Sequence, residues 1–269
     1  MATANLDLIP AAALQAVPGC GGGIPPLRLE RLAGGGDLNH TLLLYTRVGR
    51  FVLRLRRDSQ LRPGADVARE WAVQRLAAEA GLAPRVLAAD AAAGWLLMDY
   101  VPAAMWQVAD LLRPDRIAAL GRCLATLQSL PTPDLPHYDV RAVISSQVAQ
   151  ISAQDATLAS QARMLQQQAQ VLLPLVGSKP ERLVLCHGDL STGNVLGAQP
   201  LLVDWEYAQL ADPLHDIACL LSYYPQIQPQ AAPLLAALDL AGPEHRQQLT
   251  AQIRLFEIVN ALWRLRHGS

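Results

Sequence analysis

Three polar side chains in the last third of the chain have the types and spacing for metal and proton chemistry. Asp189 and Asn194 stand in a polar loop after the apolar run 183–185, and Asp204 follows the apolar run 201–203. Two short strands over these runs would deliver the side chains to strand ends, where buried β-structure meets solvent. Carboxylate and carboxamide oxygens are preferred ligands of Mg2+, and a carboxylate can accept a hydroxyl proton. The pattern therefore suits phosphoryl transfer, with Asp189 as the proton acceptor and with Asn194 and Asp204 as ligands of Mg2+ on the ATP phosphates.

The same stretch resembles a known family of kinases. The five-residue step from the loop aspartate to Asn194 equals the Asp-to-Asn step of the protein-kinase catalytic loop. The motif His-Gly-Asp at 187–189, followed by Asp-Trp-Glu-Tyr at 204–207, is similar to the aminoglycoside phosphotransferase and choline kinase superfamily, most of all to its choline kinase and thiamine kinase branches. The resemblance covers most of residues 28–222 and is specific only at 187–216. It implies a protein-kinase-like fold that uses ATP and Mg2+.

The resemblance also implies supporting roles close to the loop. His187 matches a position that packs and hydrogen-bonds to hold the loop in place. Asp216, in the motif Asp-Pro-Leu-His-Asp at 212–216, matches a carboxylate that accepts hydrogen bonds from backbone N–H groups of the loop, which is a structural role. Glu206 faces either the metal and substrate or the solvent, and the sequence leaves both possibilities open.

Five strands and one helix are predicted ahead of the loop. Alternating and apolar runs predict the strands, at residues 27–32, 38–45, 51–56, 84–87 and 95–101. A helical stripe predicts a helix over 68–80. The glycine-rich turn after the first strand can fold over a triphosphate, which makes Gly35, Gly36 and Asn39 candidate nucleotide contacts. A plain hairpin turn has the same signature.

A kinase of this shape needs a cation on its third strand to hold the α- and β-phosphates, and that cation is usually a lysine. The only lysine, Lys179, lies in a loop before the catalytic strand. Arg54 is therefore the candidate, and Arg56, which has the same parity, is its competitor. By the resemblance, Glu70 pairs with this cation, although a solvated helix glutamate has the same appearance in sequence.

The run at 95–101 resembles the hinge between the two lobes of the family. In the family, the backbone of this segment binds the edge of the adenine ring. The resemblance thus makes Asp99 and Val101 candidate nucleotide contacts, through main-chain groups that require no particular side chain.

The pattern becomes helical beyond residue 101. Apolar residues at steps of three and four predict a helix over 114–130, one or two long helices within 144–172, a helix after Asp212 and one from Pro243 onward. We therefore predict an α+β, protein-kinase-like fold with two lobes. The N-terminal lobe, 1–101, holds a five-stranded antiparallel sheet with one helix and a short N-terminal helix. The C-terminal lobe, 102–269, is larger and mainly helical.

The composition restricts partners and compartment. The 269 residues are 51% hydrophobic and 17% charged, so a sizeable core is expected. A net charge of −1 gives no attraction to nucleic acid or anionic membranes, and no apolar run approaches the ~18 residues of a membrane span. The four cysteines form no Cys-x-x-Cys pair, which favours buried free thiols in a reducing compartment. We expect a cytoplasmic protein that is a monomer or a homodimer.

The acceptor is expected to be a small alcohol. Residues 205–269 hold six aromatic residues, and an aromatic cleft suits a cationic or heteroaromatic alcohol such as choline or thiamine. Tyr207, Trp263 and Glu206 are candidate acceptor contacts, although Trp263 also fits the core face of the last helix. This span has six acids against four arginines, and two of the acids are already assigned or structural, which argues against a polycationic aminoglycoside. An aminoglycoside or sugar phosphotransferase and an inactive kinase-like binding protein are the alternatives.

Overall fold

The computed structural model describes residues 6, 9–32, 39–56, 67–131, 134–176 and 183–268. The chain has two compact units, one of residues 1–105 with 193–206 and one of residues 106–192 with 207–269. The predicted α+β class, with a five-stranded antiparallel sheet and a helix-rich remainder, is confirmed. The lobe boundary at residue 101 stays a prediction.

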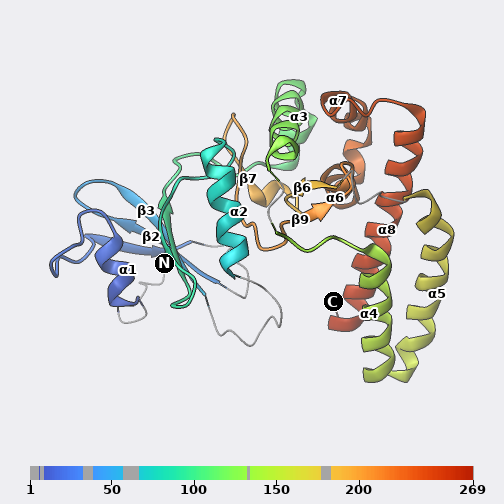
Figure 1. The fold of residues 1–269 in the computed structure, drawn as a ribbon, viewed down its shortest axis with the longest axis horizontal. Helices are drawn as coiled ribbons and strands as arrows, with labels where there is room; N and C mark the ends of the chain where they lie inside the picture. The colour runs from blue at the N-terminus through green and yellow to red at the C-terminus, as the bar shows by residue number, and fades with distance from the viewer. Residues whose placement is uncertain are drawn as a thin grey trace. The chain divides into compact units, whose positions relative to one another are not determined.

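A five-stranded antiparallel sheet forms the centre of the first unit (Figure 1). Its strands are β1 (Arg28–Arg31), β2 (Asn39–Tyr45), β3 (Arg50–Arg56), β4 (Val86–Asp90) and β5 (Trp95–Asp99). The spatial order is β1-β2-β3-β5-β4, which places β3 in the middle. Arg54 of this central strand lies opposite Thr41 on one side and Leu96 on the other.

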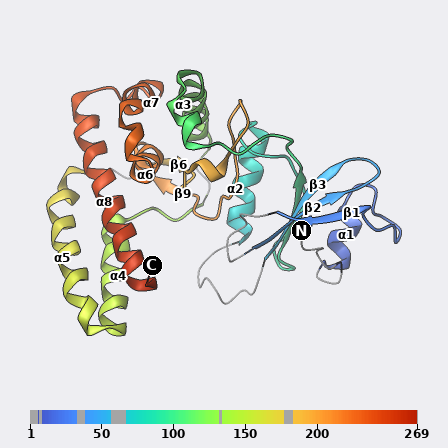
Figure 2. The same cartoon turned by 180° about the vertical axis from the view of Figure 1, so that it is seen from behind.

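Both faces of the sheet are covered, and each face has its own helix. Side chains alternate between faces along a strand, so Leu53 and Leu55 of β3 face one way and Val52 the other. The first face packs against α1 (Ala11–Ala16), the second against α2 (Val67–Glu79), and the two helices lie on opposite sides of the sheet (Figure 2). The short N-terminal helix expected from the sequence is thus part of the core.

A small hairpin also belongs to the first unit. It consists of β7 (Val195–Leu196) and β8 (Leu201–Leu202), which are antiparallel. The Leu202 N–H donates to the Leu82 carbonyl at 2.7 Å, and the Gly197 N–H donates to the Ala104 carbonyl at 3.0 Å. These backbone bonds fix the hairpin beside the sheet.

The second unit combines a two-stranded sheet with helices. Its strands are β6 (Val184–Cys186) and β9 (Gln209–Ala211). The helices are α3 (Pro114–Ser129), α4 (Val140–Gln154), α5 (Ala156–Leu172), α6 (His215–Tyr223), α7 (Ala231–Ala237) and α8 (Pro243–His267). Its short 3-10 helices include η3 (Val108–Leu112), η4 (Leu173–Leu175) and η7 (Pro225–Gln230), whereas η6 (Thr192–Asn194) spans the sequence boundary between the two units. No helix in the described part of the chain is long and apolar enough to cross a membrane.

Helices α4, α5 and α8 lie side by side (Figure 1) and share one apolar cluster. The long glutamine-rich stretch is two helices, because Asp155 ends α4 and caps α5. Its carboxylate accepts hydrogen bonds from the N–H groups of Thr157 at 2.7 Å and Leu158 at 3.3 Å. The predicted apolar stripe therefore packs inside the unit, through residues such as Ile144 and Ala162.

All four cysteines are buried and free, as the sequence predicted. Burial raises the pKa of Cys123 to about 12 and also raises the pKa of Cys186 and Cys219, and the nearby charge of Asp216 adds to all three shifts. The three thiols therefore stay protonated at neutral pH, and Cys186 beside the loop is a packing residue.

Candidate functional site

The first unit contains a cavity of about 270 Å³ beside its central strand. The lining includes residues of β2, β3, α2, β5 and the segment after it, and residues in and around the β7–β8 hairpin. Arg54, Gln74, Val101, Asn194 and Asp204 are among the lining residues. The cavity thus collects polar groups from four separate parts of the sequence.

The hairpin explains why Asn194 and Asp204 lie together. Val195 pairs with Leu202, so Asn194 comes just before one strand and Val203 just after the other. The Val203 N–H donates to the Asn194 carbonyl at 3.0 Å, and Asp204 is the next residue. The ten-residue separation in sequence therefore becomes a short distance at the open end of the hairpin.

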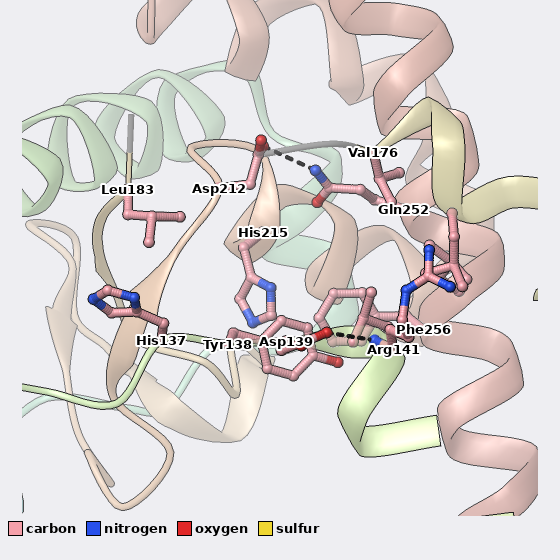
Figure 3. Close-up of a pocket in the computed structure, with 13 residues that line it drawn as sticks. His137, Tyr138, Asp139, Arg141, Val176, Leu183, Asp212, His215, Gln252 and Phe256 are labelled. Carbon is pink, nitrogen blue, oxygen red and sulfur yellow. Dashed lines mark hydrogen bonds between the residues drawn. The ribbon is translucent and has the colours of Figure 1, made fainter. Parts of the chain in front are cut away.

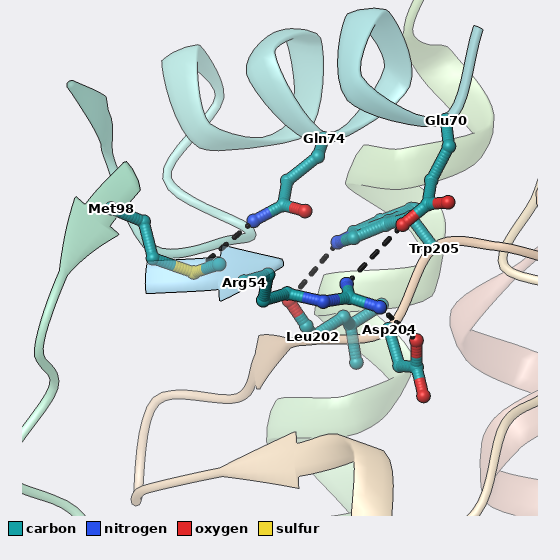
Figure 4. Close-up of polar contacts among 7 residues, drawn as sticks. All are labelled: Arg54, Glu70, Gln74, Met98, Leu202, Asp204 and Trp205. Atoms are coloured by element: carbon teal, nitrogen blue, oxygen red, sulfur yellow. Dashed lines mark hydrogen bonds and ion pairs between the residues drawn. The ribbon is translucent and has the colours of Figure 1, made fainter. Parts of the chain in front are cut away.

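Asp204 has an unusual backbone conformation. Its φ is 68°, in the left-handed region that few residues other than glycine adopt. The following residue, Trp205, is fully buried, and its indole Nε1–H donates to the Leu202 carbonyl at 3.2 Å (Figure 4). Anchoring of Trp205 in the core holds the turn, so that the Asp204 carboxylate lines the cavity.

Arg54 is a buried cation between two carboxylates. It is 8% exposed, with Nη1 3.3 Å from Glu70 Oε1 and Nη2 2.8 Å from Asp204 Oδ1 (Figure 4). The forked guanidinium can contact both acids at once. The ion pair with Glu70 is the one suggested by the resemblance, whereas sequence reasoning did not anticipate the ion pair with Asp204. Arg54 lines the cavity, and Arg56 is not among the lining residues.

Asp99, the last residue of β5, and Val101 in the segment after it also line the cavity. The N–H of Val101 has no hydrogen-bond partner among the residues that the structure describes. The Asp99 carboxylate accepts hydrogen bonds from the Arg85 guanidinium at 2.8 and 3.4 Å. Gly35 and Gly36 lie outside the described residues, and of Asn39 only the backbone, at the start of β2, is described.

The donor set beside the hairpin fits Mg2+. Asp204 and Asn194 offer one carboxylate and one carboxamide from adjacent positions. Mg2+ is usually bound through one or two such protein oxygens, with phosphates and water completing its octahedral shell. Among the described residues there is no group of three His, Cys, Asp or Glu side chains that could hold a metal ion without such help.

Asp189 lies in the second unit, after β6. Its Oδ1 accepts a hydrogen bond from the Tyr223 hydroxyl at 2.9 Å, and its N–H donates to His187 Nδ1 at 3.4 Å. Partial burial and the nearby Cys219 and Asp189 raise the pKa of Tyr223, so the phenol remains a donor at neutral pH. This contact from the end of α6 orients the Asp189 carboxylate.

Asp216 holds the loop from behind. Its side chain is fully buried, Oδ2 accepts the His187 N–H and Oδ1 accepts the Gly188 N–H, both at 2.9 Å. Gly188 has φ 81°, and a Cβ atom there would lie 2.1 Å from the Tyr207 carbonyl oxygen. The loop therefore requires glycine at 188, which is the residue between the buried His187 and Asp189.

Tyr224 fixes the next part of the loop. Its hydroxyl accepts a hydrogen bond from the Thr192 N–H at 3.1 Å and lies 2.9 Å from the Thr192 hydroxyl. Sequence reasoning counted Tyr223 and Tyr224 only among the aromatic residues of this part of the chain. Their position at the end of a helix that starts with the Asp216 brace is the signal that could have identified them.

The tentative acceptor contacts differ in exposure. Tyr207 is 44% exposed, Glu206 is half-buried, and Trp263 is 50% exposed with its ring stacked on His267. The alternative that Trp263 belongs to the core of the unit is therefore wrong. The acceptor roles of all three stay predictions.

A second cavity, of about 340 Å³, lies in the second unit (Figure 3). The rings of Tyr138 and Phe256 flank the His215 ring, with centroids 4.5 and 4.9 Å from it. Asp212 accepts hydrogen bonds from Gln252 at 2.8 Å and from Gln248 at 2.7 Å. Because α6 begins at His215, this cluster anchors the helix that carries the brace and both loop-binding tyrosines.

A sequence model described as the phosphotransferase enzyme family matches residues 29–252. No sequence among the curated proteins matches the chain. A choline/ethanolamine kinase family protein from Mesorhizobium loti is similar in structure, with 26% identity, a TM-score of 0.78 and coverage of 96% of this chain and 86% of that chain.

More distant structures share the fold. Choline kinase LicA from Streptococcus pneumoniae has 16% identity and a TM-score of 0.71, with 91% of this chain and 86% of that chain covered. A spectinomycin phosphotransferase in complex with ADP and spectinomycin has 12% identity and a TM-score of 0.55, with 89% and 93% covered. The match of the family model over most of the sequence, together with the kinase-like fold, shows that this chain belongs to the phosphotransferase enzyme family.

Proposed function

We propose that this small-molecule phosphotransferase transfers the γ-phosphoryl group of Mg·ATP to the hydroxyl group of a small cationic alcohol of the choline or thiamine type. Its family and its structural neighbours make it an enzyme that acts on hydroxyl groups. The observation that carries the finer proposal is the hydrogen bond from Tyr223 to Asp189, among exposed tyrosine rings.

The cavity of the first unit is the proposed nucleotide site. Arg54, held by Glu70, would contact the phosphates, and Asn194 and Asp204 would hold Mg2+. Bound Mg2+ would neutralise charge on the phosphates. The N–H of Val101, which has no hydrogen-bond partner among the described residues, would be available to the base. Nucleotides in neighbouring structures, AMP in one of LicA and ADP in the spectinomycin phosphotransferase, support the use of a nucleotide.

Asp189 is the proposed proton acceptor. The Tyr223 hydroxyl donates a hydrogen bond to Oδ1 and so helps to orient the carboxylate that would take the acceptor proton. The Asp216 brace and Tyr224 fix the backbone on either side. A preorganised base of this kind acts through its position.

The surroundings of Asp189 favour a monocation over a polycation. Tyr223 and Tyr207 are 42% and 44% exposed, and π-faces attract a quaternary or heteroaromatic cation by roughly 0.5–2 kcal/mol each. Two other acids of this region, Asp212 and Asp216, are held by side-chain amides and by backbone N–H groups. Binding of a polycationic antibiotic would require several carboxylates that face the ligand.

Turnover with a panel of alcohols tests the proposal. Purified protein is incubated with Mg·ATP and choline, ethanolamine, thiamine, glucosamine or kanamycin, and ADP release is measured with an acceptor-free blank. We expect kcat/KM for choline or thiamine to exceed that for kanamycin at least about tenfold, a difference of ~1.4 kcal/mol. Kanamycin as the best acceptor would favour the antibiotic phosphotransferase, and ATP binding without turnover of any alcohol would favour an inactive binding protein.

A further inference from the structure

The cavity of the second unit is separate from the catalytic loop (Figure 3). Its volume of about 340 Å³ falls within the ~300–1,000 Å³ of small-molecule sites. Leu183, which lines the cavity, precedes β6, whereas Asp189 follows the other end of that strand. The described lining residues include none of the loop, its Asp216 brace or the proposed acceptor contacts. The cavity is therefore a candidate site for a second ligand.

His215 has a ring nitrogen that is open to this cavity. The residue is only 2% exposed, and its Nε2 lies 3.1 Å from Nε2 of Gln209. The other ring nitrogen, Nδ1, has no hydrogen-bond partner among the residues that the structure describes. It is not one of the unpartnered side-chain atoms that solvent cannot reach. Since the ring lines the cavity, Nδ1 can be reached from the cavity.

The neighbours of His215 determine which nitrogen carries the ring proton. Burial lowers the pKa of His215, so the ring is neutral at pH 7 and has a single N–H. Gln209 turns its NH2 group toward Nε2, which therefore accepts, and the proton is on Nδ1. His215 thus presents an N–H donor to the cavity.

Gln252 supplies an acceptor to the same space. It is 7% exposed, and its Nε2 donates to Asp212 Oδ1 at 2.8 Å (Figure 3). The carboxylate accepts from the NH2 end of the amide, so Oε1 is the end that is left open. This oxygen has no partner within the described part of the chain and, like His215 Nδ1, can be reached by solvent. Asp212 also accepts from Gln248, so its charge does not require a cationic ligand.

The rest of the lining suits a planar molecule. Leu183, Leu255 and Phe256 give the cavity apolar walls. Gln252 stands one helical turn before Phe256, and the centroid of the Phe256 ring lies 4.9 Å from that of the His215 ring. The donor and the acceptor therefore belong to one part of the cavity. A carboxamide or lactam group carries an acceptor and a donor on neighbouring atoms and has no charge.

We propose that this cavity binds a small, uncharged, planar carboxamide or lactam, whose carbonyl oxygen accepts from His215 Nδ1 and whose N–H donates to Gln252 Oε1. A site of this kind rejects an analogue without the N–H, because the buried acceptor then stays unpaired. The inference does not depend on the nucleotide or the alcohol of the phosphotransferase. The ligand binds where α6 begins, and this helix carries Asp216, Tyr223 and Tyr224, which hold the loop.

Ligand-observed NMR titrations of the wild type and of cavity variants test the site. Nicotinamide, a carboxamide, and uracil, a lactam, are the probes, and fragments of this size should bind the wild type with a Kd on the order of 1 mM. His215→Phe keeps an aromatic ring but removes the donor, and Gln252→Leu removes the acceptor. Each should raise the Kd of both probes about fivefold or more, and thermal melts establish that each variant is folded.

Gln248→Leu is the matched control. Gln248 also donates to Asp212 from the same helix, but it is not among the described residues that line the cavity. Its replacement should change the Kd of the probes by less than about twofold, which separates the cavity acceptor from the support of Asp212. N,N-dimethylnicotinamide, which has no amide N–H, should bind the wild type about fivefold more weakly than nicotinamide does, and this difference should disappear in Gln252→Leu.

Addition of Mg·ADP distinguishes this site from the phosphoryl-transfer site. The Kd of both probes should stay the same within about twofold, since the described linings of the two cavities share no residue. Displacement of the probes by Mg·ADP, an equal Kd in the wild type and both cavity variants, or no saturable binding of either probe up to ~20 mM would overturn the inference and leave the proposed function standing. Failure to phosphorylate any alcohol would overturn the proposed function alone.

Discussion

Replacement of Asp216 by asparagine is the sharpest test of how the loop around Asp189 is held. The carboxylate accepts one backbone N–H on each oxygen, from His187 and Gly188. Asparagine keeps one acceptor oxygen and turns an NH2 group toward the other backbone N–H. One charge-assisted hydrogen bond, worth ~1.5–3 kcal/mol, is lost, and one N–H is left without a partner in the interior.

Since Asp216 is fully buried, solvent screening does not reduce these contributions. We expect the free energy of unfolding to fall by about 2–4 kcal/mol, a large part of the 5–15 kcal/mol of a typical domain. At about 2–4 °C per kcal/mol for a chain of this size, the thermal midpoint should drop by roughly 5–15 °C. Differential scanning calorimetry measures this drop, and the acceptor assay measures the accompanying loss of turnover.

Asp189→Asn is the matched control. Asparagine at 189 still accepts the Tyr223 hydroxyl through its oxygen, so the thermal midpoint should move by no more than about 1 °C. Its kcat should fall at least ~100-fold, because the proton acceptor is gone. The reasoning fails if Asp216→Asn keeps the wild-type midpoint and rate. It also fails if Asp189→Asn is destabilised as strongly, since Asp189 would then be a structural residue.

Three further substitutions probe the loop, the aromatic cluster and the cation. Gly188→Ala combines a left-handed φ with a Cβ 2.1 Å from the Tyr207 carbonyl oxygen, so it should abolish turnover and lower the thermal midpoint. Gly81→Ala is its control, because φ there is 74° but no atom lies within 4 Å of the added Cβ. The control should lower the midpoint far less, since backbone strain alone costs ~1–2 kcal/mol. Burial lowers the pKa of His215 below the ordinary histidine value of 6.5, although the charges of Asp216 and Asp212 act in the opposite direction. As the pH falls below 6.5, His215 therefore takes up a proton in the unfolded chain before it does so in the folded chain. Stability should therefore decrease as pH falls from 7 through 6.5, and pH-dependent melting of His215→Gln should show a shallower slope. Arg54→Met should weaken Mg·ATP binding about tenfold or more in a calorimetric titration, with partial recovery in Arg54→Lys, because a charge-assisted contact is worth ~1.5–3 kcal/mol. Unchanged affinity in Arg54→Met would assign the phosphates to another group.

The elements with strong periodicity were predictable from the sequence. The helices around residues 68–80, 114–130 and 243 onward were placed close to their observed limits, as were four strands of the sheet. The strand predicted at 84–87 is displaced, because β4 runs from Val86 to Asp90. Local hydrophobic spacing is sufficient for such elements, because their partners only need to present an apolar surface.

Strands defined by their partners were harder to predict. β9 is three residues long and exists because β6 pairs with it, and β8 pairs with β7 and not with β6. Likewise, the ion pair between Arg54 and Asp204 joins residues 150 positions apart. The left-handed backbone at Asp204 depends on the anchored Trp205 and has no sequence signature of its own.

Gln74 illustrates the limit of the apolar stripe on a helix. Its amide suggests a solvated face, yet it stands on the buried side of α2 with Trp71 and Ala77. A hydrophobic pattern predicts that a glutamine lies on the exposed face of a helix, and only the folded structure shows that Gln74 is buried.

The α1 helix affects how the protein can be shortened. The family match begins at residue 29, but Ile9, Ala13, Val17 and Cys20 belong to the apolar cluster on one face of the sheet. A fragment cut at the start of the family match would leave Leu44, Leu53 and Leu97 facing water. Large apolar surfaces that are exposed in this way promote aggregation. An expressed fragment should therefore retain the residues ahead of the first strand, even though they lie outside the shared family sequence.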